Sequence, residues 1–267
     1  MLRRVGNVRF EEPQGTRISV RNTGDVPATV KFLNFPGTDR ICPSWIHVSP
    51  VECTVDVGES QDIAITIMID NAESSIDVYG QKGTIDEVLV LHVEGGRDFF
   101  VRVEGTYEIT CFGLSLENQL NLEKPVRVVE DSSLIDVTTV LRSVPYALHE
   151  LTVWLLQDGR LKDSNLLQDQ EDGSGVGGIS AIRDSLDEGQ PLHPDTVPGE
   201  VIATLGHWRE LLPQPLIPTT VLYRWGNGGK GFIEQAASFL EQELPARFLH
   251  VNVYIVSLLR EMVGQRL

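Results

Sequence analysis

The period of the hydrophobic pattern changes about half way along the chain, and this change restricts the fold more than any other feature of the sequence. Apolar and polar residues alternate through residues 16–21, 28–33 and 62–69, as expected of half-buried β-strands. From residue 144 onward, apolar residues recur instead at the spacing of amphipathic helices. The sequence therefore predicts a multidomain β + α protein, in which a β domain precedes an α domain.

Turn sequences separate the predicted strands at short intervals. Two further strands are predicted at residues 86–93 and 98–106, and residues 22–25 and 56–59 have the Asn, Asp and Gly content of turns. This spacing favours an antiparallel sandwich over alternating strands and helices. We therefore expect an immunoglobulin-like β-sandwich in residues 1–110.

The second half contains three predicted helices with clear ends. Val144-Pro145 opens the first helix, and Gly159 provides its C-cap. The second helix occupies residues 201–212 and ends where Pro213 removes a backbone N–H. A third helix follows Leu244-Pro245. These helices predict an all-α domain after the sandwich.

Residues 201–218 resemble the core of a RhoGAP domain, because their amphipathic helix is closed by the sequence Leu-Pro-Gln-Pro-Leu-Ile-Pro. RhoGAP domains are all-helical modules that bind Rho-family GTPases and complete their active site with an arginine finger, usually supported by a lysine. The resemblance covers residues 143–267 and puts Gln168 at the finger position and Gly206 at the lysine position. It therefore implies a RhoGAP-like helical domain that is truncated at its C-terminal end and has no catalytic residues.

The missing arginine bears directly on activity. An arginine finger stabilises the charge that develops on the transferring phosphoryl group and raises the rate by about 10³ to 10⁵. The neutral amide of Gln168 cannot do this, so a pseudo-GAP is expected. The alternative is an active GTPase activator with a displaced finger, either Arg183 or Arg160, although Arg183 is also interpretable as half of a surface ion pair. The residues expected to face a Rho-family GTPase are Gln168, Asp169, Arg183, Trp208 and Arg209.

The β half resembles an ASH domain. The resemblance is carried by residues 22–27 (Asn-Thr-Gly-Asp-Val-Pro), 45–50 and 85–92, and by the junction Cys-Phe-Gly at 111–113. Together with the helical half, these motifs resemble the tandem C-terminal region of the type II inositol polyphosphate 5-phosphatases, the family of the Lowe oculocerebrorenal syndrome protein. The implied domains are an ASH sandwich at residues 1–110, a connector at 111–142 and a RhoGAP-like domain at 143–267.

This resemblance implies a non-catalytic module of signal transduction and membrane trafficking. In that family the ASH domain binds Rab GTPases, and the inactive RhoGAP-like domain binds Rho-family GTPases and endocytic adaptor peptides. A fragment of a phosphoinositide 5-phosphatase is a further alternative, and the phosphatase domain that precedes the ASH domain in the family is expected to be absent from this chain.

The last predicted strand of the sandwich contains two adjacent aromatic residues. Strand alternation puts Phe100 and Arg102 on one face and Phe99 and Val101 on the other, so we expect one aromatic ring in the core and its neighbour exposed. An exposed aromatic ring beside an arginine is a plausible interaction hot spot. The residues expected to contact a Rab GTPase are Asn22, Phe99, Phe100 and Arg102.

Composition restricts the partners further. The formal net charge of −16 disfavours binding to nucleic acid or to anionic lipid. No apolar run approaches the roughly 20 residues of a membrane span. We therefore expect a cytoplasmic protein that reaches endosomal or Golgi membranes only indirectly, through GTPase partners.

Neither a metal site nor a cofactor is expected. Cys42, Cys53 and Cys111 show no metal-binding spacing and are expected to be buried free thiols. The glycine-rich residues 173–178 follow a polar acidic loop, whereas a dinucleotide-binding motif needs a preceding buried strand.

Overall fold

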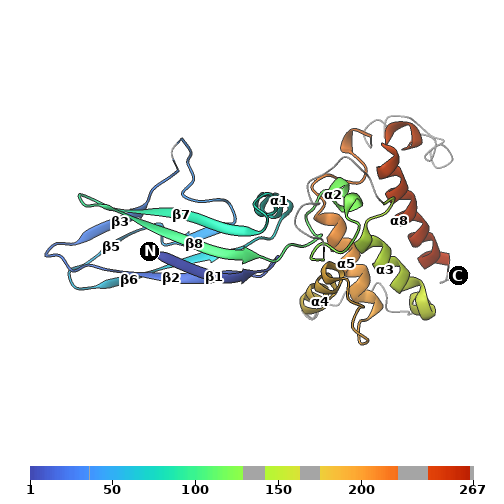
Figure 1. Cartoon of the computed structure of the whole chain (residues 1–267), viewed down its shortest axis with the longest axis horizontal. Helices are drawn as coiled ribbons and strands as arrows, with labels where there is room; N and C mark the ends of the chain where they lie inside the picture. Colours follow the sequence, from blue (N-terminus) through green and yellow to red (C-terminus); the bar gives the residue numbers. More distant parts are fainter. Residues whose placement is uncertain (36, 129–141, 163–174, 222–239, 265–267) are drawn as a thin grey trace. The chain divides into compact units, whose positions relative to one another are not determined.

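The computed structural model describes residues 1–35, 37–128, 142–162, 175–221 and 240–264 (Figure 1). The chain divides into two compact units, Met1–Ile109 (unit 1) and Thr110–Leu267 (unit 2), and each has its own architecture. Unit 1 consists mainly of strands, and the regular elements described in unit 2 are helices.

Unit 1 is a β-sandwich. Its strands are β1 (Leu2–Val8), β2 (Gln14–Arg21), β3 (Ala28–Phe32), β4 (Ile46–Ser49), β5 (Glu52–Val55), β6 (Ser60–Ile67), β7 (Thr84–Val93) and β8 (Asp98–Tyr107). A five-stranded sheet with the order β1-β8-β7-β3-β5 packs against a three-stranded sheet with the order β2-β6-β4 (Figure 1). Neighbouring strands are antiparallel except β1 and β8, which are parallel.

The core of unit 1 follows from alternation along the strands. Ile63, Ile65 and Ile67 of β6 are at most 1% exposed, whereas Asp62 beside them faces solvent. Across the pair of strands, Ile18 of β2 lies opposite Ile63 and is also buried. Each such side chain stabilises the fold by about 1.5–3 kcal/mol when it is fully buried. The predicted immunoglobulin-like sandwich is therefore confirmed.

Four elements of unit 1 were not expected from the sequence: β1, β4, β5 and helix α1. Strand β1 pairs with β8 in parallel register, interrupted by a β-bulge between Arg4 and Gly6. Helix α1 (Ala72–Gly80) follows β6 and is capped by Asn71, whose side chain accepts a hydrogen bond of 2.9 Å from the Ser74 backbone N–H. The capping asparagine was the local signal for this helix.

Unit 2 is helical in its described residues. The helices are α2 (Leu116–Asn121), α3 (Tyr146–Leu156), the 3₁₀-helix η1 (Gln157–Lys162), α4 (Gly175–Glu188), α5 (Pro198–Glu210) and α8 (Ala246–Gly264). The unit begins at Thr110, and Phe112, Leu114 and Leu120 are fully buried in it. The described residues of the expected connector therefore form part of the helical unit.

A buried hydrogen-bond chain joins α2 to α5. The Trp208 indole N–H donates to Gln119 Oε1 over 2.8 Å, and Gln119 Nε2 donates to the Leu114 carbonyl over 2.9 Å. Both side chains are at most 2% exposed. Because buried polar groups need partners, this chain fixes how the segment after Thr110 packs on α5.

Candidate functional site

The candidate site is the outer face of strands β7, β8 and β1. Where β7 pairs with β8, Val90 lies opposite Phe100 and Val88 lies opposite Arg102. Where β1 pairs with β8 on its other side, Leu2 lies opposite Arg102. Residues that are paired across strands share a face, so these side chains lie together on the side away from the core. Val101 and Val103 of β8 point the other way and are buried.

The apolar part of this face is exposed. Phe100 is 60% exposed, Leu2 46% and Val88 39%. We call these three side chains the outer patch. An exposed apolar group on a sheet face, bordered by charged residues, is characteristic of a surface that binds another protein.

Phe99 and Phe100 of β8 are both exposed, so the expectation that one of these two rings is in the core is wrong. Phe99 is 42% exposed although it shares the face of the buried Val101. It is the second residue of β8, next to the turn, and lies opposite Leu91 of β7. The guanidinium of Arg97 covers its ring at 4.8 Å from the centroid.

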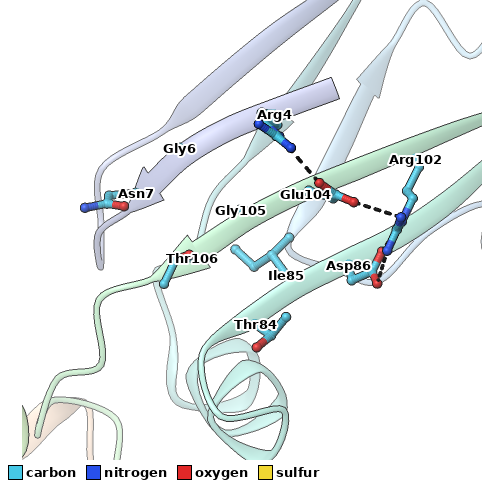
Figure 2. A pocket seen from close by; sticks show the side chains of 10 residues that line it. All are labelled: Arg4, Gly6, Asn7, Thr84, Ile85, Asp86, Arg102, Glu104, Gly105 and Thr106. Atoms are coloured by element: carbon cyan, nitrogen blue, oxygen red, sulfur yellow. Dashed lines mark hydrogen bonds and ion pairs between the residues drawn. The ribbon is translucent and has the colours of Figure 1, made fainter. Parts of the chain in front are cut away.

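A chain of ion pairs borders the outer patch (Figure 2). Arg102 donates from Nε to Asp86 Oδ1 over 2.7 Å and from Nη2 to Asp86 Oδ2 over 2.8 Å. Its Nη1 lies 2.9 Å from Glu104 Oε1, and Arg4 Nε lies 3.6 Å from Glu104 Oε2. The hydrogen bonds from Arg102 lower the pKa of Asp86. Arg102 is therefore fixed in position beside Phe100.

The same residues surround a surface hollow of about 360 Å³ (Figure 2). The paired glycines Gly6 and Gly105 lie in its lining and carry no side chain to fill it. At Gly105 an added Cβ would lie 2.6 Å from Val5 Cγ2 and 3.0 Å from the Gly6 carbonyl oxygen, so the bulged β1 requires glycine there. The hollow is lined by Arg4, Gly6, Asn7, Thr84, Ile85, Asp86, Arg102, Glu104, Gly105 and Thr106.

The predicted Rab contact at Asn22 is not supported by its position. Asn22 is 8% exposed, and its Nδ2 donates to the carbonyls of Val26 over 2.8 Å and Val55 over 2.9 Å. Its Oδ1 accepts from the Gly24 N–H over 2.9 Å. The amide thus organises the turn before β3 and is not available to a partner, because its donors and acceptor are used inside unit 1.

The residues predicted to face a Rho-family GTPase are not all on the surface. Gln168 and Asp169 lie outside the described residues. Arg183 is 2% exposed and donates from Nη2 to Ser180 Oγ over 2.9 Å, so its interpretation as a surface residue is wrong. Trp208 is 1% exposed and belongs to the core of unit 2.

The other positions that the RhoGAP resemblance singled out, Arg209, Gly206 and Arg160, have different surroundings. The side chain of Arg209 is 62% exposed and lies 3.8 Å from Glu210. Gly206 faces open space, so a longer side chain would fit there. Arg160 stacks over Trp154 at 3.9 Å from the ring centroid, and its Nη1 donates to the Trp154 carbonyl over 2.7 Å. In this structure neither Arg160 nor Arg183 extends into solvent as a finger would.

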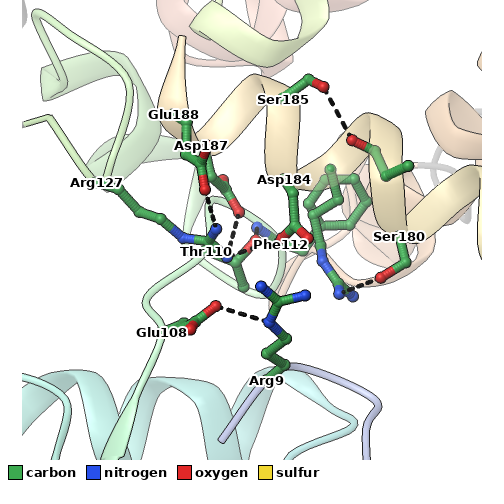
Figure 3. A network of polar contacts seen from close by, with 12 residues as sticks. Arg9, Glu108, Thr110, Phe112, Arg127, Ser180, Asp184, Ser185, Asp187 and Glu188 are labelled. Atoms are coloured by element: carbon green, nitrogen blue, oxygen red, sulfur yellow. Dashed lines mark hydrogen bonds and ion pairs between the residues drawn. The ribbon is translucent and has the colours of Figure 1, made fainter. Parts of the chain in front are cut away.

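A buried acidic residue in unit 2 had not been singled out from the sequence (Figure 3). Asp187 of α4 is 0% exposed, and its Oδ1 accepts from the Cys111 N–H over 2.9 Å. Arg127 lies 3.0 Å from Asp184, 3.6 Å from Asp187 and 3.2 Å from Glu188. Burial raises the pKa of Asp187 to about 6. The hydrogen bonds to its carboxylate and the charge of Arg127 act in the opposite direction, but burial has the larger effect. This network is structural.

The described residues provide no group of three or more His, Cys, Asp or Glu side chains that could hold a metal ion. Burial raises the pKa of the Cys42 thiol, and the charge of Glu87 raises it further. Cys42, Cys53 and Cys111 are all free cysteines, and Cys53 is only half-buried. Within the part of the chain that the structure describes, no helix is both long and apolar enough to cross a membrane.

Comparison with known proteins identifies the β unit. Residues 4–107 match the family model described as "Inositol polyphosphate 5-phosphatase OCRL-like, ASH domain". The chain is 27% identical over 222 residues to the type II inositol 1,4,5-trisphosphate 5-phosphatase of Mus musculus. That alignment covers 79% of this chain, and the chain spans only 22% of the length of that relative.

Solved structures with some similarity include two small β domains. SSP-19, an MSP-domain protein like family member of Caenorhabditis elegans, has a TM-score of 0.26 and 13% identity, covering 37% of this chain and 91% of its own. The ASH / PapD-like domain of human CEP192 has a TM-score of 0.25 and 12% identity, and the match covers 38% of this chain and 80% of the CEP192 chain.

The family match extends from the first strands of the sandwich to the end of β8. It includes the outer patch residues Val88 and Phe100 and the whole Asp86–Arg102–Glu104–Arg4 chain of ion pairs. The RhoGAP-like character of residues 143–267 lies beyond it and stays a prediction. Residues 4–107 are therefore an ASH domain of the OCRL-like inositol polyphosphate 5-phosphatase kind.

Proposed function

We propose that this chain is a non-catalytic module that binds small GTPases in membrane trafficking and signal transduction. Its ASH domain binds a Rab GTPase through the outer patch. Its helical unit, of RhoGAP-like type, binds a Rho-family GTPase or an endocytic adaptor peptide. The chain reaches endosomal or Golgi membranes through these partners, because its net charge of −16 opposes direct adhesion to anionic lipid.

The observation that carries this proposal is the exposed Phe100 beside the fixed Arg102. Aromatic and arginine side chains contribute most of the binding energy at many protein interfaces, and they do so best when they are held in place before binding. Phe100 is 60% exposed on a regular strand, and Arg102 is held by Asp86 and Glu104. This arrangement supports a preformed contact surface.

The surroundings of two arginines support a non-catalytic role for the helical unit. A finger must reach a bound nucleotide, but Arg183 is buried and Arg160 stacks on Trp154. Gln168, at the expected finger position, has no positive charge with which to stabilise a transferring phosphoryl group. Binding without acceleration of GTP hydrolysis is therefore expected.

A binding panel tests the proposal. The full chain is titrated with GTP-loaded and GDP-loaded Rab and Rho proteins, and the wild type is compared with Phe100→Ala. We expect the substitution to weaken Rab binding at least about tenfold, because it removes the exposed ring. The matched control is Val57→Ala, which shortens another exposed apolar residue of unit 1, 50% exposed, away from the patch.

Single-turnover GTP hydrolysis is followed with the same panel. Wild-type chain should leave the rate unchanged. The proposed Rab binding through the outer patch is wrong if no Rab protein binds, or if Phe100→Ala and Val57→Ala weaken binding equally. The proposed absence of GTPase activation is wrong if the wild type accelerates hydrolysis many-fold.

A further inference from the structure

One carboxylate oxygen of the hollow beside the outer patch is only weakly paired. Both Asp86 oxygens and Glu104 Oε1 contact Arg102, and Glu104 Oε2 has only the distant Arg4. The Arg4 side chain is 78% exposed and stays 3.6 Å from Glu104. At that distance and exposure, the pair contributes little. Arg4 can therefore leave the hollow at small cost.

The charged residues that line the hollow balance one another while Arg4 is in place, with Arg4 and Arg102 against Asp86 and Glu104. The chain as a whole carries a charge of −16. If Arg4 turns outward, Asp86 and Glu104 face the hollow with only Arg102 to neutralise them. A cation is the group that this site then favours.

We infer that the hollow receives a lysine or arginine side chain of the same GTPase that covers Phe100, and that Arg4 occupies its place in the free chain. The inference rests on the proposed function, since it concerns the same partner. It adds the chemistry of the second contact, a basic side chain against Glu104 and Asp86, to the apolar contact at Phe100.

The geometry allows one partner to make both contacts. Phe100 and Glu104 are both on the outer face of β8, four residues apart, which corresponds to about 13 Å along a strand. A typical interface of about 800 Å² per partner easily includes both positions. An added Cβ at Gly6 would meet no atom within 4 Å, so this glycine leaves room for an incoming side chain, and the hydroxyls of Thr84 and Thr106 line the hollow as further acceptors (Figure 2).

The test compares three charge variants in the full chain, with the GTP-loaded Rab protein that binds most tightly in the panel as probe. Glu104→Gln should weaken binding about five- to tenfold and reduce its dependence on salt, because it removes the acceptor charge. Arg4→Ala should strengthen binding about two- to fivefold, because it removes the competing cation. Glu52→Gln, an exposed carboxylate on β5 of the same sheet, is the matched control and should change nothing.

The outcomes separate this inference from the proposed function. If no Rab protein binds the wild type, the proposed function fails. If Phe100→Ala abolishes binding but Glu104→Gln and Arg4→Ala leave it unchanged, the function stands and the inference is overturned. The inference is also overturned if Arg4→Ala weakens binding, since Arg4 would then contact the partner itself. Thermal unfolding of each variant verifies that the sandwich is intact.

Discussion

Asp187 links the stability of unit 2 to pH through a single side chain. Its pKa is raised from 3.8 to about 6 because the carboxylate is fully buried. A raised carboxyl pKa means that the folded state binds the proton more tightly than the unfolded state. The stabilisation is therefore complete below about pH 4 and is lost as the pH rises through about 6. It amounts to at most about 3 kcal/mol.

We predict that Asp187→Asn removes this pH dependence. The variant side chain is neutral throughout, so the free energy of unfolding of unit 2 should no longer fall between about pH 4 and pH 6 on account of this residue. Urea unfolding of the full chain, followed by the helical circular dichroism signal, measures the effect. The control is Asp195→Asn, whose side chain is 92% exposed. Equal slopes in the wild type and Asp187→Asn would contradict the prediction.

Single residues also show where the sequence was informative about the site. The alternation along residues 98–102 correctly put Phe100 and Arg102 on one face, but Leu2 and Val88 of the outer patch were not identified from the sequence. The burial of Asn22 could not be inferred, because turn asparagines are usually on the surface and the Val55 carbonyl that it contacts is remote in sequence. Arg183 was misplaced for a related reason, since the helix packing that buries an arginine is not a local property.

Among the elements, strand β1 is the one that shapes the hollow. It carries the bulge between Arg4 and Gly6, and the bulge brings Val5 and the Gly6 carbonyl against Gly105 of β8. A bulge of this kind re-aims the side chains around it. Pairing of β1 with β8 thus depends on the absence of a side chain at residue 105.

We predict that Gly105→Ala destabilises unit 1 by about 1–3 kcal/mol, because the new Cβ would lie 2.6 Å from Val5 Cγ2 and β1 must shift. Thermal or urea unfolding of the full chain measures the loss. In the control Gly15→Ala, in β2, the nearest atoms to the added Cβ are 3.7 Å away, so stability should be unchanged or slightly higher. The prediction is contradicted if the two variants are equally stable.

Elements with strong alternation were predictable, and the others were not. The strands expected at 16–21, 28–33, 62–69, 86–93 and 98–106 correspond to β2, β3, β6, β7 and β8. Strand β1 was missed because Arg3, Arg4, Gly6 and Asn7 interrupt any alternation, and it is held by pairing with the distant β8. Tertiary pairing of this kind overrides local propensity.

At the scale of the whole molecule, the two units have separate cores. The core of unit 1 contains the isoleucines of β6, Ile18 of β2, Leu89 of β7, and Val101 and Val103 of β8, and all these residues precede Ile109. The outer patch and the hollow also lie entirely within unit 1. A sandwich that contains its own core and the whole of the proposed binding surface has what it needs to fold and bind as an independent domain.

We therefore predict that residues 1–109, expressed alone, unfold in one cooperative step and bind the same Rab protein with a Kd within about threefold of the full chain. Trp45 is the only tryptophan in this segment, is 1% exposed and donates to Asp77 Oδ2 over 2.7 Å, so its fluorescence reports unfolding of unit 1. Phe100→Ala should weaken binding equally in both proteins. Cooperative unfolding with binding lost would mean that unit 2 supplies part of the Rab site. A segment that does not unfold cooperatively would mean that the sandwich needs unit 2 for its stability.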